Sequence, residues 1–115
     1  MAIQKWSDDI TVVELSDDPV FSDELVTLLE KVEEEPSEVV LNLAAVSFVN
    51  SSNVARLLRL RKQVMGAGKR LILCGVNTQV WGIFLVTGLD KIFTFTNDIS
   101  TALATLQMGG EPSEA

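Results

Sequence analysis

Short runs of β-branched and other apolar residues alternate along the chain with longer segments in which apolar residues recur every three or four positions. The short runs are typical of strands, and the longer spacing is typical of amphipathic helices. The expected strands cover about residues 2–6, 10–15, 37–43, 70–75 and 91–96. The expected helices cover about residues 23–33, 52–65, 77–86 and 98–107. This alternation predicts an α/β domain with right-handed crossovers over residues 1–108, and a flexible polar tail at 109–115.

The first two strands are expected to pair as a hairpin, because Ser7-Asp8-Asp9 between them is a turn signal. Pro19 ends the second strand, since proline has no N–H to give to a sheet. Ser22 is then expected to cap the first helix. The core stripe of that helix is expected to comprise Leu25, Leu28, Leu29 and Val32.

The middle of the chain, residues 38–61, carries the most informative pattern. A buried strand at 39–43 leads into an apolar bend, and Asn50-Ser51-Ser52-Asn53 then opens a helix. Asn and Ser are strong N-cap residues, because their side-chain oxygens accept hydrogen bonds from the free N–H groups of the first turn. Two hydroxyl groups are therefore displayed at the positive end of a helix, which favours anions. The face of this helix that packs on the sheet is expected to comprise Val54, Leu57, Leu58, Val64 and Met65.

The later elements add to the core and leave two questions open. Cys74, at the end of strand 70–75, is expected to be a small core residue. The helix at 77–86 is apolar around most of its circumference, so it is either deeply buried or presents an interaction surface. Arg56 and Arg59 lie three residues apart, on either a solvated face or a face toward a partner. The central core is expected to comprise Leu41, Leu43, Leu57, Leu58, Ile72 and Leu73.

Charge and composition narrow the classes of function. The formal net charge of −7 disfavours nucleic acid and anionic membranes as partners, because both need concentrated Lys and Arg. The same charge is compatible with a basic protein partner. A single cysteine excludes an internal disulfide and suits a reducing compartment. No apolar run approaches the roughly 18 residues of a membrane span, and no signal-peptide pattern opens the chain, so we expect a cytoplasmic protein without membrane insertion.

The sequence offers no catalytic or metal-binding constellation. The chain has no histidine, which excludes histidine-based triads and histidine-dependent zinc sites. Ser51 and Ser52 therefore lack a histidine base, and no lysine lies close in sequence. The pairs Asp8-Asp9 and Asp17-Asp18 are interpreted as turn and cap residues. We expect a domain that is not an enzyme and that folds without cofactor or metal.

An ordered series of motifs between residues 37 and 106 resembles the signature of STAS domains, named for sulfate transporters and anti-sigma factor antagonists. The motifs are Leu41-Asn42-Leu43, Asn50-Ser51-Ser52-Asn53, Gly66-Ala67-Gly68, Leu71-Ile72-Leu73-Cys74-Gly75 and Thr87-Gly88-Leu89-Asp90-Lys91-Ile92-Phe93. The second motif in the family is Asp-Ser-Ser-Gly or Asp-Ser-Thr-Gly, so Asn50 replaces an aspartate and Asn53 a glycine. The resemblance implies a mixed sheet of four or five strands with about four helices, most of them on one face.

The resemblance also implies a function. In the anti-sigma factor antagonists, the serine after that aspartate is phosphorylated by a partner serine kinase that is also the anti-sigma factor. The matching residue is Ser51, with Ser52 at the second hydroxyl position. Ser51 is expected to be exposed, either as a phosphoserine switch in transcription regulation or as a plain N-cap. The implied partner surface comprises Asp18, Asn50, Ser51, Ser52, Asn53 and Arg56.

Two other roles of STAS domains stay open. One is a non-switching scaffold subunit of a stress-signalling assembly, which the apolar helix at 77–86 would favour. The other is a cytoplasmic accessory subunit of an ATP-binding-cassette lipid transporter, in which the same helix start docks on the ATPase. A homo-oligomer stays open as well, and a monomer at high concentration would count against the scaffold role.

Overall fold

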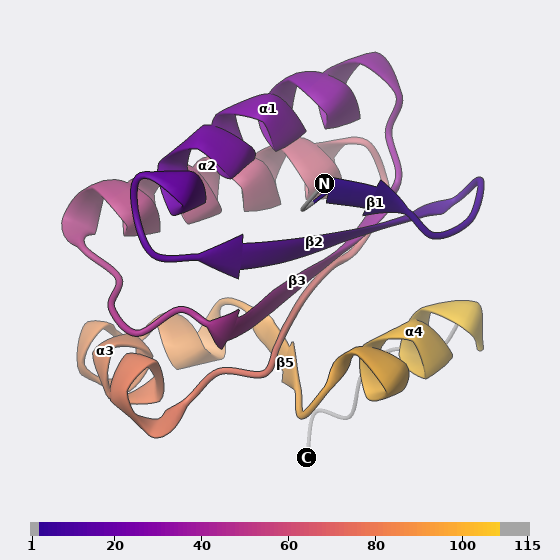
Figure 1. Ribbon diagram of the computed structural model, residues 1–115. Coiled ribbons are helices and arrows are strands. Elements are labelled where there is room, and N and C mark those ends of the chain that lie inside the picture. The colour runs from indigo at the N-terminus through magenta and orange to yellow at the C-terminus, as the bar shows by residue number, and fades with distance from the viewer. Residues whose placement is uncertain (1–2, 109–115) are drawn as a thin grey trace.

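The computed structural model describes residues 3–108, which form a mixed sheet with helices on both of its faces (Figure 1). The strands are β1 (Ile3–Lys5), β2 (Ile10–Ser16), β3 (Glu38–Ala45), β4 (Leu71–Cys74) and β5 (Thr94–Thr96). The helices are α1 (Val20–Glu34), α2 (Ser51–Gly66), α3 (Thr78–Thr87) and α4 (Ile99–Gln107), with a short 3₁₀ turn η1 at Leu89–Lys91. The predicted α/β fold is confirmed. The predicted tail, residues 109–115, lies outside the described residues.

The five strands lie side by side in the order β1-β2-β3-β4-β5. β1 and β2 form the expected antiparallel hairpin, and β2, β3, β4 and β5 are parallel neighbours. Each parallel pair needs a helical crossover, which α1, α2 and α3 supply. The carboxyl ends of the parallel strands therefore meet at one edge of the sheet, where the loops that lead into these helices gather.

The sheet is packed on both faces, because successive residues of a strand point to opposite sides. α1 and α2 lie next to each other over one face (Figure 1), and α3 adds Val80 and Phe84 to the same core. The strands contribute Leu41, Leu43 and Leu73 to this core. On the other face, α4 covers a smaller core that comprises Ile10, Val12, Val40, Ile72, Cys74, Ala102 and Leu106. Most of the helical packing is thus on one face, as predicted, but Ile72 belongs to the opposite face.

The predicted face of α2 is corrected by the structure. Leu58 is 37% exposed and Met65 is 52% exposed, whereas Leu60 is fully buried. The buried positions are Asn53, Leu57, Leu60 and Val64. These four positions are three or four residues apart, as on one face of a helix, but the first of them is the polar Asn53. A prediction from apolar residues alone therefore selects a different face of α2. The prediction of Leu58 as a core residue was wrong, and Met65 does not share the buried face of Leu57.

α1 begins three residues earlier than expected, and Ser22 is not its cap. The N-cap position is occupied by Pro19, which lacks the N–H that a helix start leaves free. The carboxylate of Asp18 supplies the capping hydrogen bonds instead. Its Oδ1 accepts from the backbone N–H of Ser22 at 2.9 Å and from the Ser22 hydroxyl at 2.7 Å.

The last strand is also shorter than predicted. Gly88 ends α3 with a φ of 76°, a conformation that glycine adopts without strain. The backbone N–H groups of Ile92 and Phe93 then both donate to the carbonyl of Leu89. This turn takes up residues that the alternating pattern assigned to a strand, so β5 pairs with β4 only from Thr94 onward.

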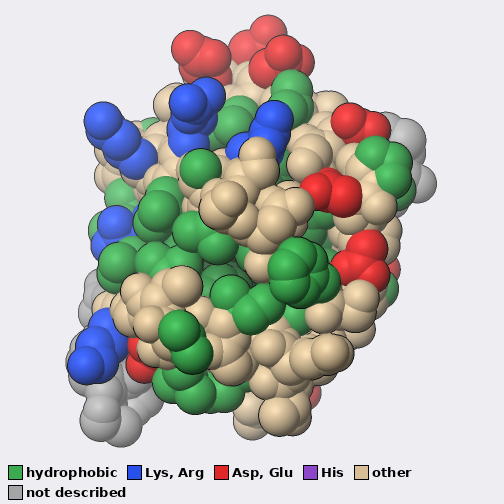
Figure 2. Space-filling view, turned by 90° about the vertical axis from the view of Figure 1, so that its left-hand side faces the viewer, with side chains coloured by type: hydrophobic (Ala, Val, Ile, Leu, Met, Phe, Trp, Pro, Cys, Tyr) green, Lys and Arg blue, Asp and Glu red, His purple; other side chains and the backbone are tan. Residues whose placement is uncertain are grey.

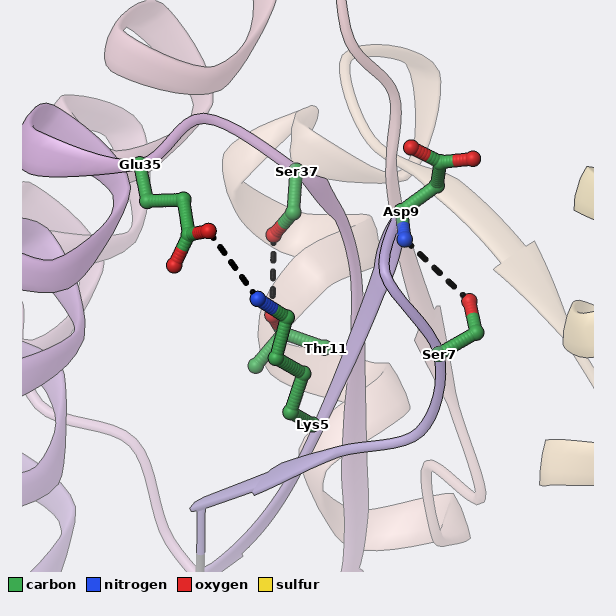
Figure 3. Close-up of polar contacts among 6 residues, drawn as sticks. All are labelled: Lys5, Ser7, Asp9, Thr11, Glu35 and Ser37. Atoms are coloured by element: carbon green, nitrogen blue, oxygen red, sulfur yellow. Dashed lines mark hydrogen bonds and ion pairs between the residues drawn. The ribbon is translucent and has the colours of Figure 1, made fainter.

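The other end of the sheet is held by polar contacts between the hairpin and the end of α1 (Figure 3). Lys5 Nζ donates to Glu35 Oε2 at 3.0 Å, and the hydroxyls of Thr11 and Ser37 lie 2.8 Å apart. Ser37 is buried, so its hydroxyl needs this partner. The Lys5–Glu35 pair is exposed and contributes little to the free energy of folding. The buried Thr11–Ser37 contact is therefore the more important of the two.

The corrected phase of α2 gives a direct test. Replacing the buried Leu57 with Ala should lower the free energy of unfolding by about 2–5 kcal/mol, because it leaves a cavity in the core. The matched variant Leu58→Ala should lower it by less than about 1 kcal/mol, since this side chain already reaches solvent. Urea unfolding with an unchanged m value measures both. Equal losses would contradict the orientation of α2.

Candidate functional site

The site is built at the edge of the sheet where β2 and β3 end and where α1 and α2 begin. This edge lies on the left in Figure 1, the side that Figure 2 turns toward the viewer. Figure 2 shows apolar side chains in the middle of this face, Lys and Arg side chains along the upper left, and Asp and Glu side chains at the top and right. In parallel α/β sheets, the carboxyl ends of the strands are the usual place for a binding site.

α2 starts with a reciprocal cap between Asn50 and Asn53. Asn50 Oδ1 accepts from the backbone N–H of Asn53 at 2.8 Å, and Asn53 Oδ1 accepts from the backbone N–H of Asn50 at 3.0 Å. Each side chain thus satisfies a free donor of the helix start, as in a capping box. The predicted cap in this motif is confirmed, and it is Asn50 that occupies the N-cap position.

Ser51 is the first residue of α2 and is exposed, as predicted. Because Asn50 caps the helix, the hydroxyl of Ser51 is not needed for the cap. In the part of the chain that the structure describes, the Ser51 hydroxyl forms no hydrogen bond. Ser52 is exposed as well, but its Oγ accepts from Arg56 Nη1 at 3.4 Å, one helical turn away. The two serines therefore differ in their surroundings.

Asn53 is turned inward and is only 2% exposed. Its Nδ2 donates to Asp18 Oδ2 at 3.1 Å and lies 3.5 Å from Ser22 Oγ. The side chain that replaces the family glycine therefore lies beneath the surface rather than on it. Asn53 links the start of α2 to the start of α1, and it leaves the surface beside Ser51 open.

Asp17 makes the second link between the two loops. Its carboxylate accepts from the backbone N–H of Ser47 at 2.9 Å, from the Ser47 hydroxyl, and from the backbone N–H of Phe48 at 3.4 Å. These hydrogen bonds, first of all from the Ser47 side chain, hold the pKa of Asp17 below its usual value. The Ser22 and Asn53 side chains similarly lower the pKa of Asp18. Both residues are therefore carboxylates at neutral pH.

The surface beside Ser51 combines apolar and cationic groups. Phe48, in the bend before α2, is 61% exposed. A groove runs between α1 and α2, and its walls include the side chains of Val26 and Leu29 on α1 and of Arg56 and Arg59 on α2. No carboxylate within residues 3–108 forms an ion pair with Arg56 or Arg59. The site can thus contact both apolar and charged groups of a partner.

The loop between β4 and α3 completes this edge. Asn77 Oδ1 caps α3 by accepting from the backbone N–H of Val80 at 2.9 Å, and its Nδ2 donates to the Val46 carbonyl at 2.6 Å. α3 is amphipathic in its burial: Val80 and Phe84 lie in the core, whereas Leu85 is 51% and Val86 is 88% exposed. One side of this helix is therefore buried, and its other side leaves apolar side chains exposed.

The polar groups available at this edge are carboxylates, amides, hydroxyls and the guanidinium groups of Arg56 and Arg59. No group of three or more Cys, Asp or Glu residues within residues 3–108 could hold a metal ion. Cys74 is buried, as predicted, and burial raises the pKa of its thiol to about 11, with a smaller effect from Asp98. The thiol therefore stays protonated. Within the same described range, no helix is long and apolar enough to cross a membrane.

A sequence model of the STAS domain matches residues 7–102. The chain belongs to the STAS domain family. SpoIIAA, an anti-sigma factor antagonist solved in its unphosphorylated form, matches with a TM-score of 0.77 at 15% identity, over 93% of this chain and 95% of that chain. A Ser-to-Glu variant of RsbS from Moorella thermoacetica matches with a TM-score of 0.76 at 18% identity, over 94% and 97%. A sulfate transporter family protein from Wolinella succinogenes matches with a TM-score of 0.69 at 22% identity, over 87% and 84%.

In this STAS domain, sequence reasoning found the helix start but missed its supports. Asp18, Asn50, Ser51, Ser52, Asn53 and Arg56 all lie at the start of α2, although Asp18 precedes it by more than thirty residues. Asp17, Ser22 and Ser47 were not expected to take part in the site. Their pairing leaves no local pattern, because Asp17 and Ser47 are 30 residues apart. The only local signal was that two adjacent carboxylates precede a proline.

The contacts of Asp18 predict its titration. Ser22→Ala removes the largest cause of the lowered pKa, so the pKa of Asp18 should rise toward its usual value of 3.8. Ser52→Ala, which removes a hydroxyl that does not contact Asp18, should leave it unchanged. Carbon-detected NMR of the Asp18 carboxyl measures both values. A depressed pKa also means that Asp18 stabilises the fold above about pH 4, and that this contribution is lost as pH falls through the folded-state pKa. Identical titration in both variants would contradict the Asp18–Ser22 contact.

Proposed function

We propose that this STAS domain is a regulatory module that binds a protein partner with the surface at the start of α2, and that phosphorylation of Ser51 switches this binding. One observation carries the proposal: Ser51 is exposed at the first position of α2, and its hydroxyl is not needed for the cap. A phosphate can be added there without the loss of a hydrogen bond of the fold. Structures of SpoIIAA in its unphosphorylated and phosphorylated forms support a switch of this kind.

The physical effect of the phosphate is local. It adds about −1.5 to −2 charges at neutral pH, at a helix N-terminus that stabilises anions. Asp17 and Asp18 already place two negative charges at this edge of the domain. The modification therefore adds strong negative charge and bulk to the contact surface beside Phe48. A partner fitted to the unmodified surface would then be released without unfolding of the domain.

The proposal gives the surface residues different roles. Ser51 is the phosphorylated residue, and Ser52, which lies against Arg56, is a contact residue. Asn50 and Arg56 flank them on the surface, whereas Asn53 and Asp18 hold the helix start in place. The phosphate comes from ATP through a partner serine kinase that also acts as the anti-sigma factor. The domain itself is then a cytoplasmic, non-enzymatic regulator of transcription.

A scaffold subunit of a stress-signalling assembly is the second candidate, and the outer side of α3 favours it. Leu85 and Val86 are both more than half exposed on one helix. Exposed apolar side chains that lie close together favour contact with another protein. Sedimentation at high protein concentration distinguishes the two candidates, since a scaffold should self-associate through α3 and a switch can remain a monomer.

The switch is tested with the serine kinase whose gene lies nearest to that of this protein. Ser51→Asp should weaken binding at least tenfold, about 1.4 kcal/mol, because it adds a charge within the contact surface. Its melting temperature should not change, since aspartate is favourable in the first turn of a helix. Titration calorimetry and thermal unfolding measure the two effects.

Two matched variants complete this test. Ser52→Asp adds the same charge one residue away, but the guanidinium of Arg56 lies close enough to offset it, so binding should weaken less. Ser51→Ala should bind the kinase and should not be phosphorylated. If the folded Ser51→Asp variant binds as tightly as the unmodified domain, Ser51 is an ordinary first-turn residue and the switch is excluded.

A further inference from the structure

A separate cavity lies at the far end of α2 from Ser51, between the end of that helix, the start of β4 and the turn before β5. Its apolar walls include Met65, Leu71, Ile92 and Phe93. β5 pairs with β4 only from Ile72 onward, so Leu71, which lines the cavity, pairs with β3 but has no partner in β5. Its volume of about 110 Å³ is enough for several water molecules or for one small ligand.

Two side chains bring uncompensated positive charge to this cavity. Arg61 and Lys69 both line it, and no carboxylate in the described part of the chain forms an ion pair with either. The Nε of Arg61 donates to the Ile92 carbonyl at 3.2 Å, which fixes the guanidinium at the rim. An arginine held in this way loses little conformational freedom when it binds an anion.

A third cation, Arg70, lines the same cavity but is already paired. Its Nε lies 3.6 Å from Glu38 Oε1, and its Nη2 donates to the Leu106 carbonyl at 3.1 Å. The Arg70–Glu38 pair is therefore close to neutral, and the positive charge of the cavity comes from Arg61 and Lys69. The chain has a net charge of −7 and only nine Lys and Arg residues, so three cations around one cavity are unusual for it.

The charges are not explained by the end of α2. Cations are favourable near helix C-termini because the last carbonyls carry partial negative charge. Here the carbonyls of Val64 and Met65 accept from the backbone N–H groups of Ala67, Gly68 and Lys69, so the chain itself satisfies them. The last turn of the helix holds no basic residue.

We infer that this cavity binds a small anion with a short apolar group, such as a phosphate monoester or a carboxylate with a chain of a few carbons. The anionic group lies between Arg61 and Lys69, where charge-assisted hydrogen bonds are strong. The apolar group contacts Met65 and Ile92, which are 52% and 40% exposed. Methionine adapts its shape readily to such a group.

The test titrates the whole domain with butyl phosphate, butyrate, butanol or inorganic phosphate. Binding of each probe is measured from the changes in the amide NMR chemical shifts. Butyl phosphate should bind saturably, with shifts at Met65, Lys69 and Ile92, and at least tenfold more tightly than inorganic phosphate. Each buried methylene should improve affinity about fourfold. Butyrate should bind at the same residues, whereas butanol, which has no charge, should not. Vesicles of phosphatidylcholine with phosphatidic acid should not bind, because the cavity is too small for a lipid headgroup with its chains.

Variants of the cations give the controls. Lys69→Gln should weaken butyl phosphate at least fivefold, and so should Arg61→Gln. Lys62→Gln removes one positive charge from α2, next to Arg61 in the sequence, but Lys62 does not line the cavity. This variant should change the affinity less than twofold. Because Arg61 also contacts the Ile92 carbonyl, Lys69→Gln is the decisive variant if Arg61→Gln unfolds. The inference is overturned if butyl phosphate and inorganic phosphate bind with equal affinity, or if Lys62→Gln loses as much affinity for butyl phosphate as Lys69→Gln. It is also overturned if the domain binds only to the vesicles.

Discussion

The carboxylates of Asp17 and Asp18 are the constraint on which the functional edge of this domain depends. Both belong to the loop between β2 and α1, and both bind groups from the segment that leads into α2. Asp17 contacts the bend before the helix, and Asp18 contacts Asn53 in its first turn. Two connections that are distant in the sequence are thereby held together. These hydrogen bonds add to the Asn77–Val46 contact, which holds the loop before α2 to the loop before α3.

This arrangement separates the residues that hold the helix start from the residue that it displays. Asn50 caps α2, Asn53 points inward, and Ser51 is left free on the surface. The family motif has an aspartate and a glycine at the two asparagine positions. In this chain, the two amides bind each other's backbone, and the carboxylate is supplied from Asp18. The first turn of α2 therefore has no carboxylate of its own, and the one that contacts it comes from the loop before α1.

Three basic residues in the middle turns of α2 line two different sites. Arg56 and Arg59 line the groove that starts near Ser51, and Arg61 lines the cavity near the end. A chain with 16 acidic and nine basic residues thus has its positive charge concentrated on one helix and the turn after it. Arg56, Arg59 and Arg61 form no ion pair within the described range, so they remain available to bind anionic groups. The two ends of α2 then differ in what they can recognise.

The sequence by itself determined the order of strands and helices and the starts of α2, α3 and α4. Asn50, Asn77 and Asp98 each accept from a backbone N–H three residues ahead, so the signal for these caps is contained in four consecutive residues. The tertiary structure decided which of three nearby leucines of α2 is exposed, because that depends on how the helix rests on the sheet and on α1. It also decided that Asp17 meets Ser47 across 30 residues. Two residues so far apart in the sequence meet because the crossover between parallel strands brings the ends of β2 and β3 to the same edge of the sheet. No short stretch of the sequence predicts this contact.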